Sequence, residues 1–64
     1  MKYQEDDLIE LLEDKRVLHD IYLKKGTLVY INKIDDNQIN VSEINSVFDF
    51  WITADNIALV ERSR

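Results

Sequence analysis

Most of the chain alternates between apolar and polar residues with a period of two, which is typical of short β-strands with one face in a core. Val, Ile, Tyr and Phe are frequent in these stretches, and strands favour these residues. The pattern predicts five strands, at residues 17–23, 27–34, 38–42, 47–52 and 57–61. Five short strands joined by brief turns indicate a mainly β domain that closes into a small five-stranded barrel.

The N-terminal part of the chain has a different pattern. Its apolar residues have the i, i+3, i+4 spacing of an amphipathic helix: Leu8, Ile9, Leu11 and Leu12. Acidic residues precede this stretch and basic residues follow it, as suits the two ends of a helix dipole. We therefore expect a short N-terminal helix over residues 5–15. The alternative is an extra N-terminal strand over residues 8–12, because periodicity alone does not separate the two for so short a run.

Two places carry the chemistry of tight turns. Gly26, the single Gly of the chain, follows two Lys residues and supplies the positive φ that a turn needs. The run Asp35-Asp36-Asn37 lies between two alternating stretches and predicts a hairpin turn.

Length and composition indicate one domain spanning residues 1–64, with an acidic N-terminal segment (1–15) and a β-barrel (16–61). The chain has no Cys, which fits a reducing compartment. Its start lacks the features of a signal peptide, and no apolar run approaches the roughly 18 residues of a membrane span. We expect a cytoplasmic protein without a membrane partner.

The net charge of −5 is concentrated at the N-terminus. Residues 1–14 hold one base and six acids, a net of −5: the acids are Glu5, Asp6, Asp7, Glu10, Glu13 and Asp14. These six residues form a candidate acidic surface. A nucleic-acid binder needs a basic stripe to neutralise phosphates, and none is visible, so nucleic acid is an unlikely partner.

Two segments resemble the SH3-like family. Residues 23–31, with an apolar residue before Lys24-Lys25-Gly26 and a strand after it, look like one conserved segment of that family. Residues 51–60 are similar to its closing segment, in which a strand, a short 3₁₀ turn and a final strand follow one another. The resemblance covers residues 17–61 and implies a divergent SH3-like small barrel of the bacterial or phage type.

The departures from this family bear on function. The family's Pro is Thr53 here, and its ligand-stacking Tyr is Asn56. Because those two positions help to line the groove that receives polyproline helices, the substitutions imply that this chain does not read polyproline segments. An SH3-like fold carries many unrelated activities, so the resemblance names no partner.

Strand alternation selects the candidate partner-binding residues. Tyr30 points outward if Val29 and Ile31 face the core. In residues 47–52, the face with Phe48, Phe50 and Ile52 is the expected core face, which leaves Trp51 exposed beside Asp49. Trp51, Tyr30 and Asp49 are therefore the candidates, since Trp and Tyr are common binding hot spots. The alternative is that Trp51 packs in the core.

No group of residues suggests catalysis, a cofactor, a bound small molecule or a metal. His19 has no Cys and no Ser-containing motif to act with. Asp35-Asp36-Asn37 lacks the Gly and the bidentate Glu of a calcium loop. We expect a protein that is not an enzyme.

Three functional hypotheses remain. The first is a non-catalytic protein–protein interaction module that binds another protein, or itself, through the Trp51/Tyr30 face. The second is a small acidic inhibitor that occupies the basic site of a nucleic-acid-processing protein through residues 5–14. The third is a small-barrel nucleic-acid binder.

Overall fold

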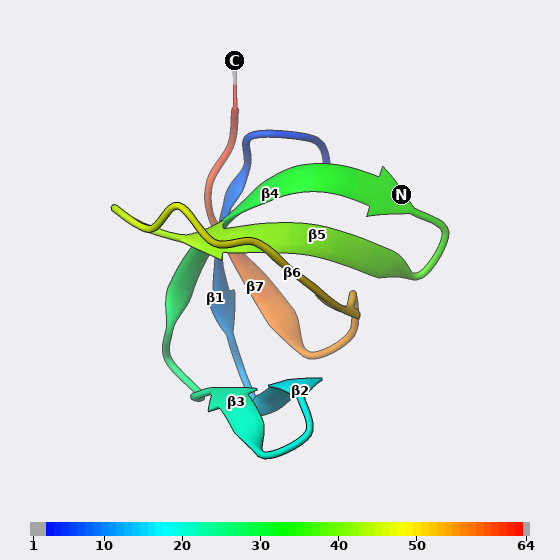
Figure 1. Cartoon of the computed structure of the whole chain (residues 1–64). Coiled ribbons are helices and arrows are strands. Elements are labelled where there is room, and N and C mark those ends of the chain that lie inside the picture. The colour runs from blue at the N-terminus through cyan, green and yellow to red at the C-terminus, as the bar shows by residue number, and fades with distance from the viewer. Residues whose placement is uncertain (1–2, 64) are drawn as a thin grey trace.

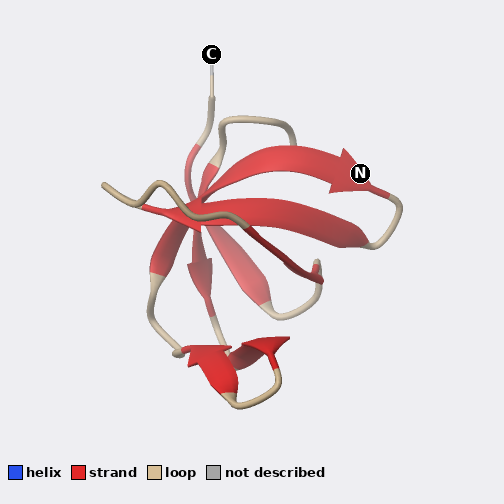
Figure 2. Cartoon of the chain, in the orientation of Figure 1, coloured by secondary structure: helices blue, strands red, loops and turns tan. Residues whose placement is uncertain are grey.

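Seven β-strands and their turns account for the regular structure in this computed structural model, which describes residues 3–63 (Figures 1 and 2). The strands are β1 (Leu8–Leu11), β2 (Lys15–Leu18), β3 (Ile21–Leu23), β4 (Leu28–Asp35), β5 (Gln38–Glu43), β6 (Phe50–Thr53) and β7 (Ile57–Glu61). Five of them form an antiparallel sheet in the order β6-β5-β4-β1-β7. The other two, β2 and β3, form a separate hairpin at the lower end of Figure 1.

The predicted N-terminal helix is wrong, and residues 3–63 contain no helix at all. The segment instead forms β1, which lies inside the sheet between β4 and β7, so the alternative of an extra N-terminal strand is confirmed. Ile9 and Leu11 are fully buried, while Leu8 and Glu10 lie on the other face. Burial thus follows a period of two. A strand with a neighbour on each side satisfies its backbone in the sheet and needs no helix.

The predicted closed barrel is also wrong, because the sheet is open. The edge strands β6 and β7 do not pair with each other. The stretch 17–23, expected as one sheet strand, turns back at His19-Asp20 and supplies the separate β2–β3 hairpin. The sheet therefore contains four of the five predicted strands, and β1 takes the place of the fifth.

The core lies on one face of the curved sheet and follows the predicted alternation. Its buried residues are Ile9, Leu11, Leu23, Val29, Ile31, Ile39, Val41, Ile52 and Ile57. In β4 the alternation is interrupted, because three positions separate Ile31 from the next core-facing Ile34. A bulge at Asn32 resolves this: Ile31 pairs with Val41 and Lys33 with Asn40, so the extra residue returns Ile34 to the core face opposite Ile39.

The turns use the residues that tolerate left-handed backbone. Gly26 has φ 91°, as its sequence context predicts, and its N–H donates to the carbonyl of Leu11 at 2.7 Å. Asp36 has φ 57° in the two-residue turn between β4 and β5. Asp and Asn enter this region more readily than other side chains, which explains their place at the remaining turns.

A buried carboxylate joins the two ends of the chain. Asp7 is fully buried and accepts hydrogen bonds from the backbone N–H groups of Gln4 (3.0 Å) and Ser63 (2.8 Å). Arg62 Nη1 lies 3.2 Å from Asp7 Oδ2. Burial by itself raises the pKa of Asp7, but these hydrogen bonds and the Arg62 charge outweigh it, and the pKa lies below its ordinary value of 3.8. The carboxylate is therefore ionised and structural.

Candidate partner-binding cleft

Trp51 lies on the outer face of β6, away from the core. Its neighbour Ile52 is buried on the inner face, whereas Trp51 is 45% exposed. Directly across the sheet, Trp51 pairs with Asn40 of β5. The half-exposed position keeps part of the indole available to a partner while the strand holds its backbone in place.

A cleft of about 340 Å³ opens beside Trp51. One side comes from the outer surface of β5 and β6, and the other from the chain that leads into β2. The lining residues are Glu13, Asp14, Lys15, Arg16, Gln38, Trp51, Ile52 and Thr53. The cleft therefore combines one large aromatic surface with polar groups of both charges.

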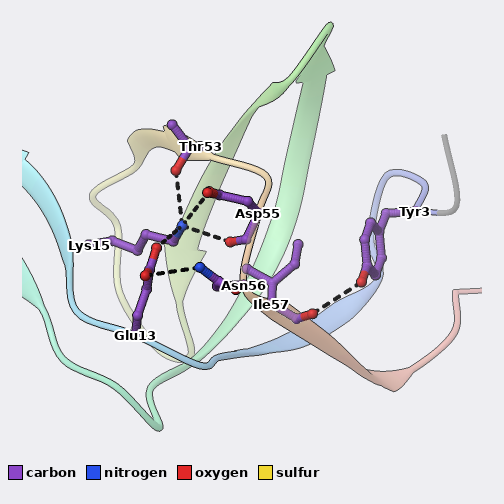
Figure 3. A network of polar contacts seen from close by, with 7 residues as sticks. All are labelled: Tyr3, Glu13, Lys15, Thr53, Asp55, Asn56 and Ile57. Carbon is purple, nitrogen blue, oxygen red and sulfur yellow. Dashed lines mark hydrogen bonds and ion pairs between the residues drawn. The ribbon is translucent and has the colours of Figure 1, made fainter.

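Lys15 fixes the two sides of the cleft relative to each other (Figure 3). Its side chain is only 4% exposed, yet its ammonium group is fully engaged. It donates to Glu13 Oε2 (2.9 Å), Thr53 Oγ1 (2.9 Å), and to both the carbonyl (2.7 Å) and Oδ1 (2.8 Å) of Asp55. A buried ammonium needs such partners, since an uncompensated charge in the interior is strongly destabilising.

The same network includes Asn56, which follows Asp55 in the chain. Asn56, which has φ 51°, donates from Nδ2 to Glu13 Oε1 at 3.0 Å. Hydrogen bonds from Lys15 and then Thr53 lower the pKa of Asp55 to about 2. Thr53 and Asn56 are the residues that replace the Pro and Tyr of the SH3-like pattern. Here both have a structural role, because they hold the segment 53–56 against residues 13–15.

A row of polar side chains connects Trp51 with Tyr30 on the same outer face. Asn32 Nδ2 donates to Asn40 Oδ1 (3.1 Å) and to Ser42 Oγ (3.3 Å). Tyr30 pairs directly with Ser42, just as Trp51 pairs with Asn40. The structure thus brings the two candidate aromatics onto one surface, separated by three hydrogen-bonded residues that the sequence analysis did not single out. The only sign of these three residues in the sequence was the interrupted alternation of apolar and polar residues in β4.

Phe48 and Asp49 belong to the strand predicted over residues 47–52, but the structure places both outside β6. Residues 47–49 belong to the loop between β5 and β6, and β6 begins only at Phe50. Asp49 is exposed there and does not join the outer-face row. Phe48 is not in the core as expected but is largely exposed. The prediction failed because alternation was extended through a segment that has no strand to pair with.

The six acidic residues of the N-terminal segment are dispersed. Glu5 and Asp6 are exposed in the first turn, and Asp7 is buried in the clasp with Ser63. Glu10 is half-buried on the outer face of β1. Glu13 and Asp14 line the Trp51 cleft, where Glu13 is bound to Lys15 and Asp14 Oδ1 accepts from the backbone N–H of Lys25 at 2.8 Å. They do not make one continuous acidic surface.

Positive and negative residues are also separated within the rest of the chain, a feature that the sequence analysis did not identify. Residues 15–33 hold five bases and one acid, a net of +4, whereas residues 34–61 hold six acids and no base, a net of −6. In the fold, the first group covers the β2–β3 hairpin and β4 as far as Lys33, and the second covers the end of β4, then β5, β6, β7 and their loops. The net charges of the two groups largely offset each other, so the net charge of the whole chain does not reveal the separation.

Within residues 3–63, no three His, Cys, Asp or Glu side chains are placed to hold a metal ion. No helix in that range has the length and apolar character required to cross a membrane.

Comparisons with family models, curated proteins and solved structures give no match to this chain.

Proposed function

We propose that the protein is a non-catalytic interaction module that binds an extended segment of another protein in the Trp51 cleft. The observation that carries this proposal is the position of Trp51, 45% exposed on one side of a cleft of about 340 Å³. Trp is the residue most enriched at binding hot spots.

The two sides of the cleft support a preformed site. Lys15 ties the entry to β2 to the segment 53–55 through four short contacts, so the cleft does not have to be assembled when a partner arrives. Preorganisation lowers the entropic cost of binding. The rim holds Asp14 and Arg16, charges of opposite sign that favour a partner segment with a polar or charged residue on each side of an apolar one.

The experiment uses Trp51 as its own probe, because it is the only Trp in the chain. A library of linear peptides is selected against the protein, and the selected peptides are titrated while indole fluorescence is recorded. We expect a blue shift on binding, and a loss of affinity of about tenfold or more for Trp51→Ala, as for a hot-spot residue.

The matched control is Phe48→Ala, which removes an exposed aromatic side chain from the β5–β6 loop without touching the cleft. It should bind the same peptides as the wild type. Peptides that bind Trp51→Ala and wild type equally would refute the proposal. An unfolded Trp51→Ala protein, seen by circular dichroism, would also count against it, because Trp51 would then be a core residue.

A distant relationship to the SH3-like family is part of this proposal. It is supported by the strand order, in which the first strand lies between the second sheet strand and the last, and by the hairpin inserted after the first strand. The turn at Gly26 and the short link from β6 to β7 lie where the resemblance expects them. The relationship concerns strand order and turns and does not extend to polyproline binding.

The acidic-inhibitor hypothesis has weaker support. Asp7, one of its six carboxylates, is buried inside the protein, and Glu13 is already paired with Lys15. Of the others, Glu5 and Asp6 lie in the first turn, Glu10 on β1 and Asp14 beside the cleft. Steering by the overall charge of −5 would still favour a basic partner over an acidic one.

A further inference from the structure

One exposed apolar surface is the loop between β5 and β6, here called the loop surface (residues 43–49). Val47 is 94% exposed and Phe48 67% exposed. The loop is nevertheless ordered by short-range contacts: the N–H of Ser46 donates to the carbonyl of Glu43, and the N–H of Phe48 to Ser46 Oγ, each at 3.1 Å. Two adjacent apolar side chains are thus held in solvent by a defined turn.

A second exposed apolar surface is the β2–β3 hairpin, here called the hairpin surface (residues 16–25). Leu18 and Ile21 pair across its turn, and Tyr22 pairs with Arg16. Leu18, Ile21 and Tyr22 are each more than half exposed. The hairpin belongs to no larger sheet, and a two-stranded hairpin alone is only marginally stable in water. Its apolar tip extends beyond the core that buries Leu23.

The two surfaces carry opposite charges. The loop surface is bordered by Glu43 and Asp49, both exposed, and lies within a stretch of 28 residues, 34–61, that has no Lys or Arg. The hairpin surface has Arg16, Lys24 and Lys25, all exposed, against the single acid Asp20. Apolar groups bordered by acids on one surface therefore match apolar groups bordered by bases on the other.

The apolar side chains of the two surfaces do not cover each other within one molecule. Figure 1 shows the hairpin at the lower end of the protein, while the yellow loop projects from the left side of the sheet. The two surfaces approach each other only where Glu43 pairs with Val29, four residues after Lys25. Val47 and Phe48, like Leu18, Ile21 and Tyr22, remain mostly exposed, so they are available to a second molecule.

We propose that the loop surface of one copy docks on the hairpin surface of a second copy, head to tail. Val47 and Phe48 pack against Leu18, Ile21 and Tyr22 of the neighbour, while Glu43 and Asp49 face its Lys24 and Lys25. Because the two contacting surfaces differ, each copy can bind one neighbour through its loop surface and another through its hairpin surface. The assembly is a ring or a filament, not a twofold dimer.

Other occupants of the loop surface fit the observations less well. An anionic lipid surface would be repelled by Glu43 and Asp49. Edge-to-edge pairing of β7 in two copies is hindered by the extra residue Val60, a bulge between the pairs Leu8–Glu61 and Ile9–Leu59. The docked surfaces are small, so the contact is weak, with a dissociation constant on the order of 100 μM at low salt.

The test is sedimentation equilibrium of the full chain over a range of concentrations up to about ten times that constant, so that most of a weakly associating protein would be bound. We expect the weight-average mass to rise with concentration at low salt and to fall toward the monomer mass at high salt. The double variant Glu43→Lys/Asp49→Lys and the double variant Lys24→Glu/Lys25→Glu should each lose association by about tenfold or more.

An equimolar mixture of the two double variants provides the decisive measurement, because it restores opposite charges across the contact. We expect association in the mixture to return to about the wild-type level. The control Glu5→Lys/Glu61→Lys makes the same change in net charge away from both surfaces and should associate at least as well as the wild type. Phe48→Ser should reduce association without a change in net charge.

Three results would overturn the proposal. They are a wild-type protein that stays monomeric at all concentrations, association that the two double variants leave unchanged, and a mixture that stays monomeric although each variant is folded by circular dichroism. None of these results bears on the Trp51 cleft, whose test uses selected peptides and fluorescence.

Discussion

The carboxylate of Asp7 accepts a hydrogen bond from the backbone N–H of Ser63 at 2.8 Å, although the two residues lie 56 positions apart in the chain. This contact, with the ion pair to Arg62, fixes the C-terminal end of β7 against the turn that precedes β1. Because β1 and β7 are paired strands, the contact joins residues 4–7, before β1, to residues 62 and 63, after β7.

Replacement of Asp7 by Asn should therefore lower the free energy of unfolding by about 2 kcal/mol, since the buried carboxylate loses its charge-assisted hydrogen bonds from Gln4 and Ser63 and its ion pair with Arg62. Urea unfolding followed by circular dichroism measures the change. Asp6→Asn is the matched control: Asp6 is exposed, and Asn tolerates its φ of 72°. A loss for Asp7→Asn no larger than that for Asp6→Asn would contradict the structural role of the clasp.

Acid should destabilise the wild-type protein more than the Asp7→Asn variant. The pKa of Asp7 is lowered in the folded state from 3.8, so its contribution to stability is present above pH 3.8 and is lost as the pH falls through the lower folded value. Urea midpoints measured between about pH 7 and pH 2 should fall for the wild type and change less for the variant. Equal acid dependence in the two proteins would show that Asp7 is not the responsible group.

Lys15→Met should destabilise the fold by about 1–2 kcal/mol, because the hydrogen bonds that join Glu13, Thr53 and Asp55 through the buried ammonium are lost. It should also loosen the segment 13–16, which lines the cleft beside Trp51. Trp51 would then be more exposed to water, and its fluorescence emission at neutral pH should shift to the red. The neighbouring Arg16→Met is the control, since Arg16 lines the cleft but is exposed. An unchanged emission spectrum in Lys15→Met would mean that the cleft does not depend on this network.

Asn32→Ala should cost about 1–2 kcal/mol of stability, because Asn40 loses the donor to its nearly buried Oδ1. Lys33→Ala, at the exposed neighbouring position of the same bulge, should change stability by less than about 0.5 kcal/mol. Thermal unfolding of the two variants gives the comparison. Similar melting temperatures for both would indicate that the polar row on the outer face is only a surface feature.

Much of the core was predictable because it follows local alternation. Val29, Ile31, Ile39, Val41 and Ile52 are apolar at every second position of their strands, and each is buried. The turn at Gly26 was predictable for a similar reason, since positive φ is a property of that residue and its neighbours. In these places the sequence signal and the structural cause lie within the same few residues.

The candidate site was predictable only in part. Trp51 and Tyr30 were selected by alternation, and the structure places both on the outer face. The cleft itself needed Lys15 and Asp55, which are forty positions apart in the chain, and no local pattern connects them. Phe48 was assigned to the core because a strand pattern extends through it, although no partner strand lies there to bury it.

What the sequence determined by itself is the mainly β character, the core alternation and the positions of the tight turns. The tertiary structure decided the rest. Leu8, Ile9, Leu11 and Leu12 fit both a helix and a strand, and the pairing of β1 with β4 and β7 selects the strand because it satisfies the backbone on both sides. Likewise Asp7 and Lys15 appear as surface charges in the sequence, and only the approach of residues distant in the chain makes their burial stable.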